Sequence, residues 1–259
     1  MSYRFFHLHK EDSVGCIRID RPPVNAFDLE AMQEFGALIE NVGADRDIRV
    51  VMISGSTKVF SAGADINMLN SSEDDYLIGF LELCQQTLRK VEMLAKIVIA
   101  AIEGHCVGGG LELALACDFR FMAQGENKIC LAEIRIGVIT AWGTTYRLPR
   151  LIGKSKALDL IITGRLLDAE EAQKIGLVDR IFPPGDIMSK TLEYAKDIAK
   201  GAPVAIGMAK KCINEGMDKD FSEVIRLERE SQMRLFNTRD FKEGVRAFLE
   251  KKTAEFKGK

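Results

Sequence analysis

The stretch from Ile97 to Phe121, IVIAAIEGHCVGGGLELALACDFRF, decides the fold because it combines a buried strand, a glycine turn and a helix start. Ile97 to Ile102 is a short, continuous apolar run rich in branched side chains, which is typical of a strand covered on both faces. The residues from Leu111 to Cys117 are good or tolerable helix formers. The stretch therefore predicts a strand, a sharp turn and a helix in succession.

Three consecutive glycines form the turn. Gly108, Gly109 and Gly110 lack side chains, so another molecule can approach the backbone closely. The first N–H groups of the helix have no partner within it, and they lie at the positive end of the helix dipole, which suits an oxygen that gains negative charge. Glu112 is an acid among apolar residues just inside this helix. The same features fit a tight strand-to-helix connection with Glu112 complementing the dipole, so both interpretations stay open at this point.

Composition excludes several classes of protein. The chain has 259 residues, 47% of them hydrophobic, which is long enough for a sizeable core. Its net charge of -2 leaves no global basic field for nucleic acid. The N-terminus has no apolar core followed by a cleavage site, and no run is long enough to span a bilayer, so a cytoplasmic protein without membrane contact is expected.

No metal site is expected either. Six cysteines are scattered through apolar segments without a CxxC pair, which is typical of buried free thiols in a reducing compartment. His7 and His9 alternate on one predicted strand, but no third ligand accompanies them.

On the N-terminal side, the pattern of apolar residues predicts alternating strands and helices. Lys58 to Ile66, KVFSAGADI, is predicted to be a loop rich in small residues after a buried strand, where sites in layered α/β folds tend to lie. The predicted strands are Tyr3 to His9, Val14 to Asp20 and Arg49 to Ser54, and the predicted helices are Asp28 to Asn41 and Ser71 to Ala95.

On the C-terminal side, short strands lead to Glu133, which has apolar neighbours that a purely solvated acid would not need. Gly137 to Arg150 is predicted to be a turn-rich connection. The predicted strands are Asp118 to Met122, Lys128 to Leu131 and Leu177 to Phe182; the predicted helices are Lys154 to Thr163, Asp168 to Ile175, Ile187 to Lys200, Pro203 to Asn214, Phe221 to Phe236 and Thr238 to Lys251. This pattern alone predicts a mixed α/β fold.

Several motifs occur together at consistent separations. They are Phe60 to Ile66 (FSAGADI), Glu103 to Glu112 (EGHCVGGGLE), Cys117 with Asp118, Glu133 to Gly137 (EIRIG), Arg147 to Gly153 (RLPRLIG), Thr163 to Asp179 and the ending Glu243 to Phe256. In these motifs the chain resembles the crotonase family of enoyl-CoA hydratases and isomerases. The resemblance implies a spiral of repeated ββα units over residues 1–200 with the acyl-CoA site, and a helical trimerisation region over residues 201–259. It also implies homotrimers that commonly pair into hexamers.

The resemblance further implies the reaction and its residues. It places an oxyanion hole on the backbone N–H groups of Ala64 and Gly109, which would stabilise the enolate-like intermediate of an acyl-CoA thioester. It assigns Glu112 mainly to the attacking water and Glu133 mainly to the proton, and two such carboxyls should titrate as a coupled pair. Two carboxylates favour a hydratase that adds water reversibly across the 2,3 double bond, a reaction of fatty acid metabolism, because isomerases of the family usually need only one.

The family pattern indicates the substrate contacts less sharply. It places Lys58 near the nucleotide, and Phe248 and Lys251 of a neighbouring subunit over the adenine and a phosphate. Lysines on a surface are more often simply solvated. Further predicted substrate contacts are Ala62, Asp65, Ile66 and Gly110. CoA is part of the substrate, so no separate cofactor is expected.

The clearest departure from the family follows Gly137. Typical hydratases have a proline and several glycines where this chain has ITAWGT, Ile139 to Thr144. We hypothesise that Trp142 restricts chain length or stacks on a flat, cyclic or unsaturated acyl group; packing against the helical region is the equally weighted alternative.

Three other classes of function remain open. An enoyl-CoA isomerase, or a hydratase of a cyclic dienoyl-CoA, would use the same enolate. A nucleic-acid-binding member would need a basic stripe with aromatic residues, and only the pair Lys210 and Lys211 is present. A serine hydrolase would need a Ser/His/Asp constellation, and no GxSxG occurs.

Overall fold

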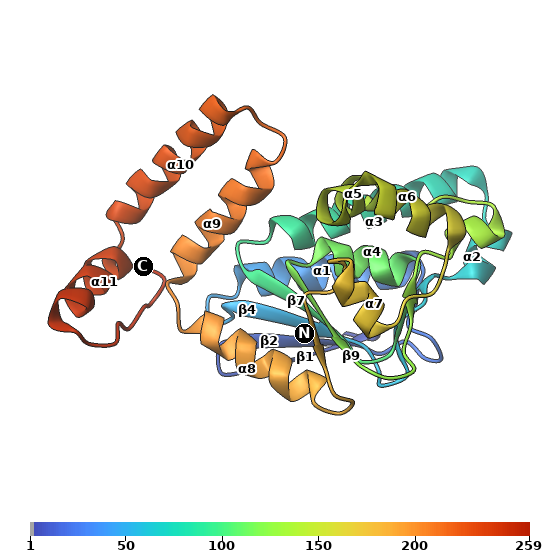
Figure 1. Ribbon diagram of the computed structural model, residues 1–259, viewed down its shortest axis with the longest axis horizontal. Coiled ribbons are helices and arrows are strands. Elements are labelled where there is room, and N and C mark those ends of the chain that lie inside the picture. The colour runs from blue at the N-terminus through green and yellow to red at the C-terminus, as the bar shows by residue number, and fades with distance from the viewer. Residues whose placement is uncertain (1–2) are drawn as a thin grey trace.

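The computed structural model describes residues 3–259 as an α/β core from which a helical arm projects (Figure 1). This confirms the predicted mixed α/β class. Met1 and Ser2, the first residues of the predicted core region, lie outside the described residues. The division into a core and a trimerisation region stays a prediction.

A six-stranded sheet forms the centre of the core, in the order β1-β2-β4-β7-β9-β11. Its first two strands are antiparallel and the others pair in parallel. The strands are β1 (Phe6–Glu11), β2 (Val14–Ile19), β4 (Val50–Ser54), β7 (Ile97–Ile102), β9 (Phe119–Ala123) and β11 (Arg180–Phe182). Strand β7, with the bounds that the sequence predicts, lies between β4 and β9.

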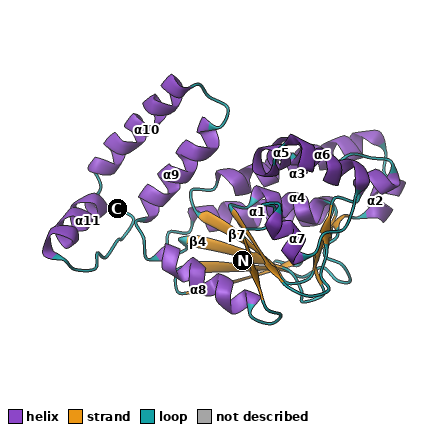
Figure 2. Ribbon diagram, in the orientation of Figure 1, coloured by secondary structure: helices purple, strands orange, loops and turns teal. Residues whose placement is uncertain are grey.

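The continuous apolar run of β7 follows from burial on both faces. Val98 and Ala100 belong to the larger core cluster, which includes residues of helices α1 (Leu29–Ala44), α3 (Asp74–Met93) and α4 (Gly109–Ala116). Ile99 and Ala101 alternate with them and join the cluster that includes residues of α8 (Ile187–Ala199). Helices thus cover both faces of the sheet (Figure 2).

The chain repeats one local plan. A strand of the large sheet is followed by a short strand of a smaller sheet and then by helical structure. The short strands β5 (Val59–Ser61), β8 (His105–Val107) and β10 (Ile129–Cys130) form a parallel sheet in the order β10-β8-β5, and β3 (Ala26–Phe27) pairs with β6 (Gly63–Ala64). These are the repeated ββα units that the resemblance implies.

Several predicted segments differ from the structure. Half of the predicted turn-rich connection is helix α5 (Thr144–Ile152), in which Thr144, Leu148 and Ile152 are buried at helical spacing; this packing outweighs the low helix propensity of Thr, Tyr and Pro. The predicted loop Lys58 to Ile66 contains β5 and β6. A separate short helix, α2 (Ile66–Ser71), precedes α3.

The remaining helices complete the core and build the arm. Alpha helices α6 (Lys154–Thr163) and α7 (Ala169–Lys174) belong to the core, and the arm consists of α9 (Pro203–Gly216), α10 (Phe221–Phe236) and α11 (Arg239–Glu250). Lys210 anchors α9: its buried ammonium donates to Asp118 at 2.7 Å and to the Lys96 carbonyl at 3.0 Å. Lys210 is therefore not part of a surface for nucleic acid. Among the helices of residues 3–259, none has the length and apolar content needed to cross a bilayer.

Candidate active site

The N-terminus of α4 and strand β6 bring the two predicted oxyanion donors together. Gly108 turns the chain into α4 with a left-handed φ of 55°, and every residue of α4 is buried. A Cβ built on Gly63 would lie only 2.4 Å from the Gly109 nitrogen. Ala64 follows Gly63 directly and pairs with Phe27 of β3. The predicted donors Ala64 and Gly109 thus belong to two elements whose backbones are in contact.

Glu112 is a buried carboxylate on α4, with 2% of its surface exposed. It accepts hydrogen bonds from the Thr140 hydroxyl and, at 2.8 Å, from the Trp142 N–H, both on Oε1. A buried charge is tolerated when such donors satisfy it. Because both donors meet Oε1, neither of them occupies Oε2.

Glu133 begins the short 3-10 helix η1 (Glu133–Ile136), where it faces the same turn. A Cβ on Gly108 would lie 3.2 Å from Glu133 Oε1, and Oε2 is buried without a hydrogen-bond partner within the described residues. Burial, with a contribution from the charge of Glu112, raises the pKa of Glu133 to about 7. The two carboxyls therefore interact, and Glu133 readily holds a proton near neutral pH.

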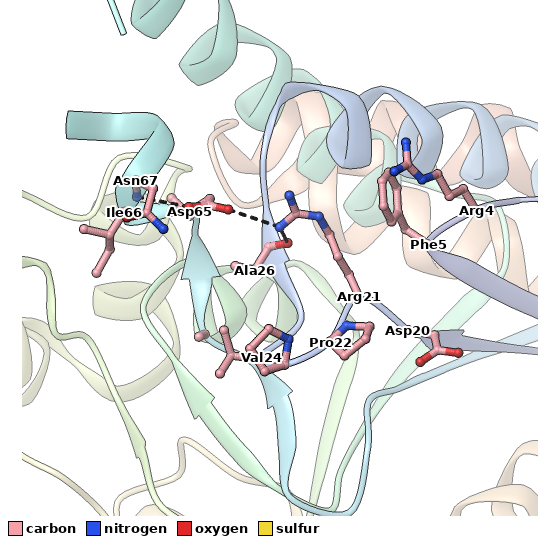
Figure 3. A pocket seen from close by; sticks show the side chains of 13 residues that line it. Arg4, Phe5, Asp20, Arg21, Pro22, Val24, Ala26, Asp65, Ile66 and Asn67 are labelled. Atoms are coloured by element: carbon pink, nitrogen blue, oxygen red, sulfur yellow. Dashed lines mark hydrogen bonds and ion pairs between the residues drawn. The ribbon is translucent and has the colours of Figure 1, made fainter. Parts of the chain in front are cut away.

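A groove of about 590 Å³ runs beside β6 (Figure 3). It brings together four of the predicted site residues, Ala62, Ala64, Asp65 and Ile66. Ile66 exposes most of its side chain there, so an apolar surface is available to a ligand. The other lining residues are Arg4, Phe5, Asp20, Arg21, Pro22, Pro23, Val24, Ala26 and Asn67.

Arg21 is a lining residue that the sequence did not single out. Its guanidinium donates to Asp65 at 3.3 Å, to the Ala26 carbonyl at 2.8 Å and to Asp28. Figure 3 shows the Arg21 side chain pointing toward Asp65, with the interaction between them marked by a dashed line. Asp65 also caps α2 by accepting from the Asn67 N–H at 3.0 Å. These contacts fix the loop that carries Ala64.

The other predicted substrate contacts lie elsewhere. Gly110 packs against β5, where a Cβ would stand 2.3 Å from the Ser61 carbonyl oxygen. Lys58 is exposed and does not line the groove. Phe248 and Lys251 belong to the end of α11, at the opposite side of the molecule from α2 (Figure 1). Within one chain, they do not meet the groove.

Trp142 is a buried side chain beside the oxyanion donors. Its ring packs edge-on against Phe27 at 6.1 Å and Phe80 at 5.8 Å between ring centroids. It also covers Gly109, where a Cβ would stand 2.4 Å from the ring. Packing next to Gly109 is compatible with both hypotheses for Trp142, so the acyl-pocket role stays a prediction.

Thr140 and Arg147 make contacts near Glu112 that the sequence did not predict. Arg147 Nη1 donates to the Trp142 carbonyl at 2.8 Å, and Nη2 donates to Glu92 at 3.1 Å. Thr140 lies in the segment where typical members of the family have a proline and several glycines. A hydroxyl at such a position is the feature of the sequence that could have indicated a hydrogen-bond donor here. Both residues hold the segment that contacts Glu112.

Comparisons with known proteins agree with this geometry. The family model described as enoyl-CoA hydratase/isomerase matches residues 9–259. A probable enoyl-CoA hydratase from Rhizobium meliloti is 39% identical, and the alignment covers 99% of each chain. A crotonyl-CoA hydratase from Syntrophomonas wolfei is 35% identical, with 99% of each chain covered.

Solved structures are similar over the same length. The crystal structure of an enoyl-CoA hydratase from Geobacillus kaustophilus superposes with a TM-score of 0.97, at 42% identity, over 100% of this chain and 98% of that one. This likeness confirms the predicted crotonase-like spiral. The chain belongs to the enoyl-CoA hydratase/isomerase family.

Proposed function

We propose that this protein is an enoyl-CoA hydratase, which adds water reversibly across the 2,3 double bond of a 2-enoyl-CoA. The observation that carries the proposal is the pairing of two carboxyls of different character at one helix start. Glu112 is held by two hydrogen-bond donors, whereas burial and the charge of Glu112 raise the pKa of Glu133 to about 7. A base and an acid are thus available side by side at neutral pH.

The proposed reaction uses each group once. The thioester oxygen accepts from the N–H groups of Ala64 and Gly109, which stabilise the charge it gains as the enolate forms. Glu112 removes a proton from water while the water oxygen bonds to C3, and protonated Glu133 gives its proton to C2. The net change is the addition of one water; a proton then passes from Glu112 to Glu133 and restores the starting state.

The CoA portion of the substrate is proposed to lie in the groove beside β6. Ala62, Asp65 and Ile66 line this groove. Ala64, one of the two proposed oxyanion donors, lines it as well. Since Lys58 is exposed and outside the groove lining, its nucleotide contact would require the end of the CoA to extend onto the surface. A relative named crotonyl-CoA hydratase supports a short acyl group.

The arm supports a proposed trimer or hexamer. Phe248 and Leu249 are 82% and 75% exposed at the end of α11, although both are strongly apolar. An assembly would bury them, and it would allow Phe248 and Lys251 to reach the CoA of a neighbouring subunit. Location in the cytoplasm also stays a proposal.

The test is mass spectrometry of crotonyl-CoA incubated with the enzyme in heavy-oxygen water. We expect the product to gain one labelled water with the wild type. Glu112→Gln and Glu133→Gln should each abolish the gain, whereas Glu193→Gln, on the exposed side of α8, should retain it. A wild type that only moves the double bond of a 3-enoyl-CoA would instead establish an isomerase, and a cyclic dienoyl-CoA as the sole hydrated substrate would establish the other alternative.

A further inference from the structure

The hydroxyl of Thr140 donates a hydrogen bond to Glu112, the proposed base. Thr140 is 1% exposed, and its Oγ1 donates to Oε1 of Glu112 across 28 residues of sequence. Glu112 lies on a helix whose other residues are apolar and buried, so its donors must come from elsewhere. They come from one segment, as the Thr140 hydroxyl and the Trp142 N–H.

This segment is fixed at both ends. At its start, the Val138 N–H donates to the Glu133 carbonyl at 3.2 Å. At its end, Arg147 binds the Trp142 carbonyl and is itself paired with Glu92. The Thr140 hydroxyl is therefore presented by a backbone segment, residues 138–142, that is anchored at both ends. Its first anchor is the Glu133 carbonyl, so the segment that positions Glu112 is itself tied to Glu133.

The location of both donors on one oxygen has a geometric consequence. Rotation about the last side-chain bond of a glutamate is broad, so an unrestrained carboxylate presents either oxygen at varying angles. Two donors on Oε1 restrict that rotation and leave Oε2 for another partner. A hydratase base needs one oxygen held toward its water, because misplacement of a reacting group lowers the rate strongly.

We propose that Thr140 is a positioning residue for the hydration reaction: with the Trp142 amide it fixes Oε1 of Glu112 and keeps Oε2 directed at the water. This role rests on the proposed hydratase function. Typical hydratases have a proline and several glycines in this segment, and neither residue has a hydroxyl that could donate to Glu112. The positioning contact is thus supplied by the part of the chain that departs from the family pattern.

Two titratable groups that interact with Glu112 are Glu133 on η1 and Cys84 on α3. The charge of Glu112 contributes to the raised pKa of Glu133. Burial, and to a lesser degree Glu112, raises the pKa of the Cys84 thiol, which stays neutral. Loss of the Thr140 hydroxyl would leave the Trp142 N–H as the one donor to Glu112 Oε1 among the described residues.

The experiment measures kcat, KM and the pH profile of crotonyl-CoA hydration for Thr140→Val and Thr140→Ser. We expect Thr140→Val to lower kcat by about ten- to a hundredfold, the range for a lost hydrogen bond to a charged group, with KM within about threefold of wild type. The fall in rate that loss of the Glu133 proton gives above about pH 7 should stay in place, because Thr140 does not contact Glu133. Thr140→Ser, which keeps the hydroxyl, should restore kcat. Thr191→Val is the matched control, because it removes a buried hydroxyl on the far side of the sheet that has no hydrogen-bond partner among residues 3–259.

The outcomes separate the two proposals. A wild type without hydratase activity overturns the proposed function, and the positioning role with it. A wild type that hydrates crotonyl-CoA, with kcat unchanged in Thr140→Val, overturns the positioning role alone, as does an equal loss of kcat in the Ser and Val variants. If Thr140→Val fails to fold, Thr140→Ala and Thr140→Ser give the same comparison, since both lack the methyl group and differ only in the hydroxyl.

Discussion

Gly63 lies against Gly109 so closely that a Cβ on Gly63 would stand 2.4 Å from the Gly109 nitrogen. This contact joins the β6 loop to the start of α4 and sets the separation of the two proposed oxyanion donors. We expect Gly63→Ala to push them apart and to lower hydratase activity by about a hundred- to a thousandfold, as loss of one donor does in other enzymes.

Gly185→Ala is the control for that prediction. Its φ of 85° matches the 84° of Gly63, but a Cβ there meets no heavy atom within 4 Å in the described part of the chain beyond its sequence neighbours. Both variants should lose about 1 kcal/mol of stability from the left-handed conformation. Gly63→Ala should lose more than that, because its Cβ also meets the Gly109 backbone. Steady-state kinetics and thermal unfolding compare them; equal activities would argue against a steric link between the donors.

The pKa of Glu133 predicts a pH dependence of activity. A carboxyl with a pKa of about 7 loses its proton as pH rises through neutrality, and a proton donor is then lacking. We expect kcat/KM for crotonyl-CoA to fall above about pH 7. Rates measured in overlapping buffers check this, and a constant kcat/KM up to pH 9 would exclude Glu133 as the donor.

The same group predicts a pH dependence of stability. Because folding raises the pKa of Glu133 from 4.5 to about 7, the folded state binds a proton that the unfolded state has lost between these values. The contribution of Glu133 to the free energy of unfolding therefore falls as pH rises from 4.5 to about 7, and it is constant above about pH 7. Glu133→Gln should be more stable than wild type at pH 8, by about 1 to 3 kcal/mol, and the difference should vanish below pH 4.5. Denaturant unfolding at several pH values measures it.

Trp142→Ala tests the acyl-pocket hypothesis. Removing the ring leaves a cavity beside Gly109, Phe27 and Phe80, which should cost about 3 to 5 kcal/mol of stability. If the ring limits the acyl group, turnover of longer enoyl-CoAs or of a cyclic dienoyl-CoA should rise relative to crotonyl-CoA. Phe121→Ala, a fully buried ring on the other side of the sheet, controls for lost stability. Unchanged relative rates would leave Trp142 as a packing residue only.

The exposed end of α11 predicts self-association. Phe248→Asp should shift the protein toward smaller species, because it places a charge on a surface that a trimer would bury. Phe248→Leu keeps the apolar character and should assemble as wild type does. Light scattering after size-exclusion chromatography measures both masses; a wild type that is monomeric at micromolar concentration would contradict the proposed assembly.

Much of the fold could be predicted from sequence wherever local signals agree. The bounds of β7 and of helices α6 and α10 match the prediction, since apolar periodicity and flanking glycines or an acid mark them. Helix α5 was missed because Thr, Tyr and Pro favour a turn locally. Only the packing of Thr144, Leu148 and Ile152 reveals the helix.

In the candidate site, too, the features that depend on packing between distant segments could not be predicted from local sequence signals. Motif resemblance indicated both glutamates, and the structure brings them to one turn. Their donors depend on a segment folding back onto α4, which neither periodicity nor a motif specifies. The Thr140 hydroxyl is visible in the sequence, but its partner is not. Likewise, nothing local indicates that Gly110 serves packing against Ser61.

Every residue of α4 is buried, so substitutions in this helix disturb packing, whereas exposed positions of the chain tolerate substitution. Each position of this helix contacts the interior, so a change made there is transmitted to the oxyanion donor and to Glu112 together. Ile66 in the groove and Ile139 are exposed and belong to other elements, whereas Thr140, which follows Ile139, is buried. A laboratory library that seeks new acyl-CoA substrates should therefore randomise exposed positions such as Ile66 and Ile139 and leave α4 and Thr140 untouched, because the exposed positions can change without moving the groups that hold Glu112.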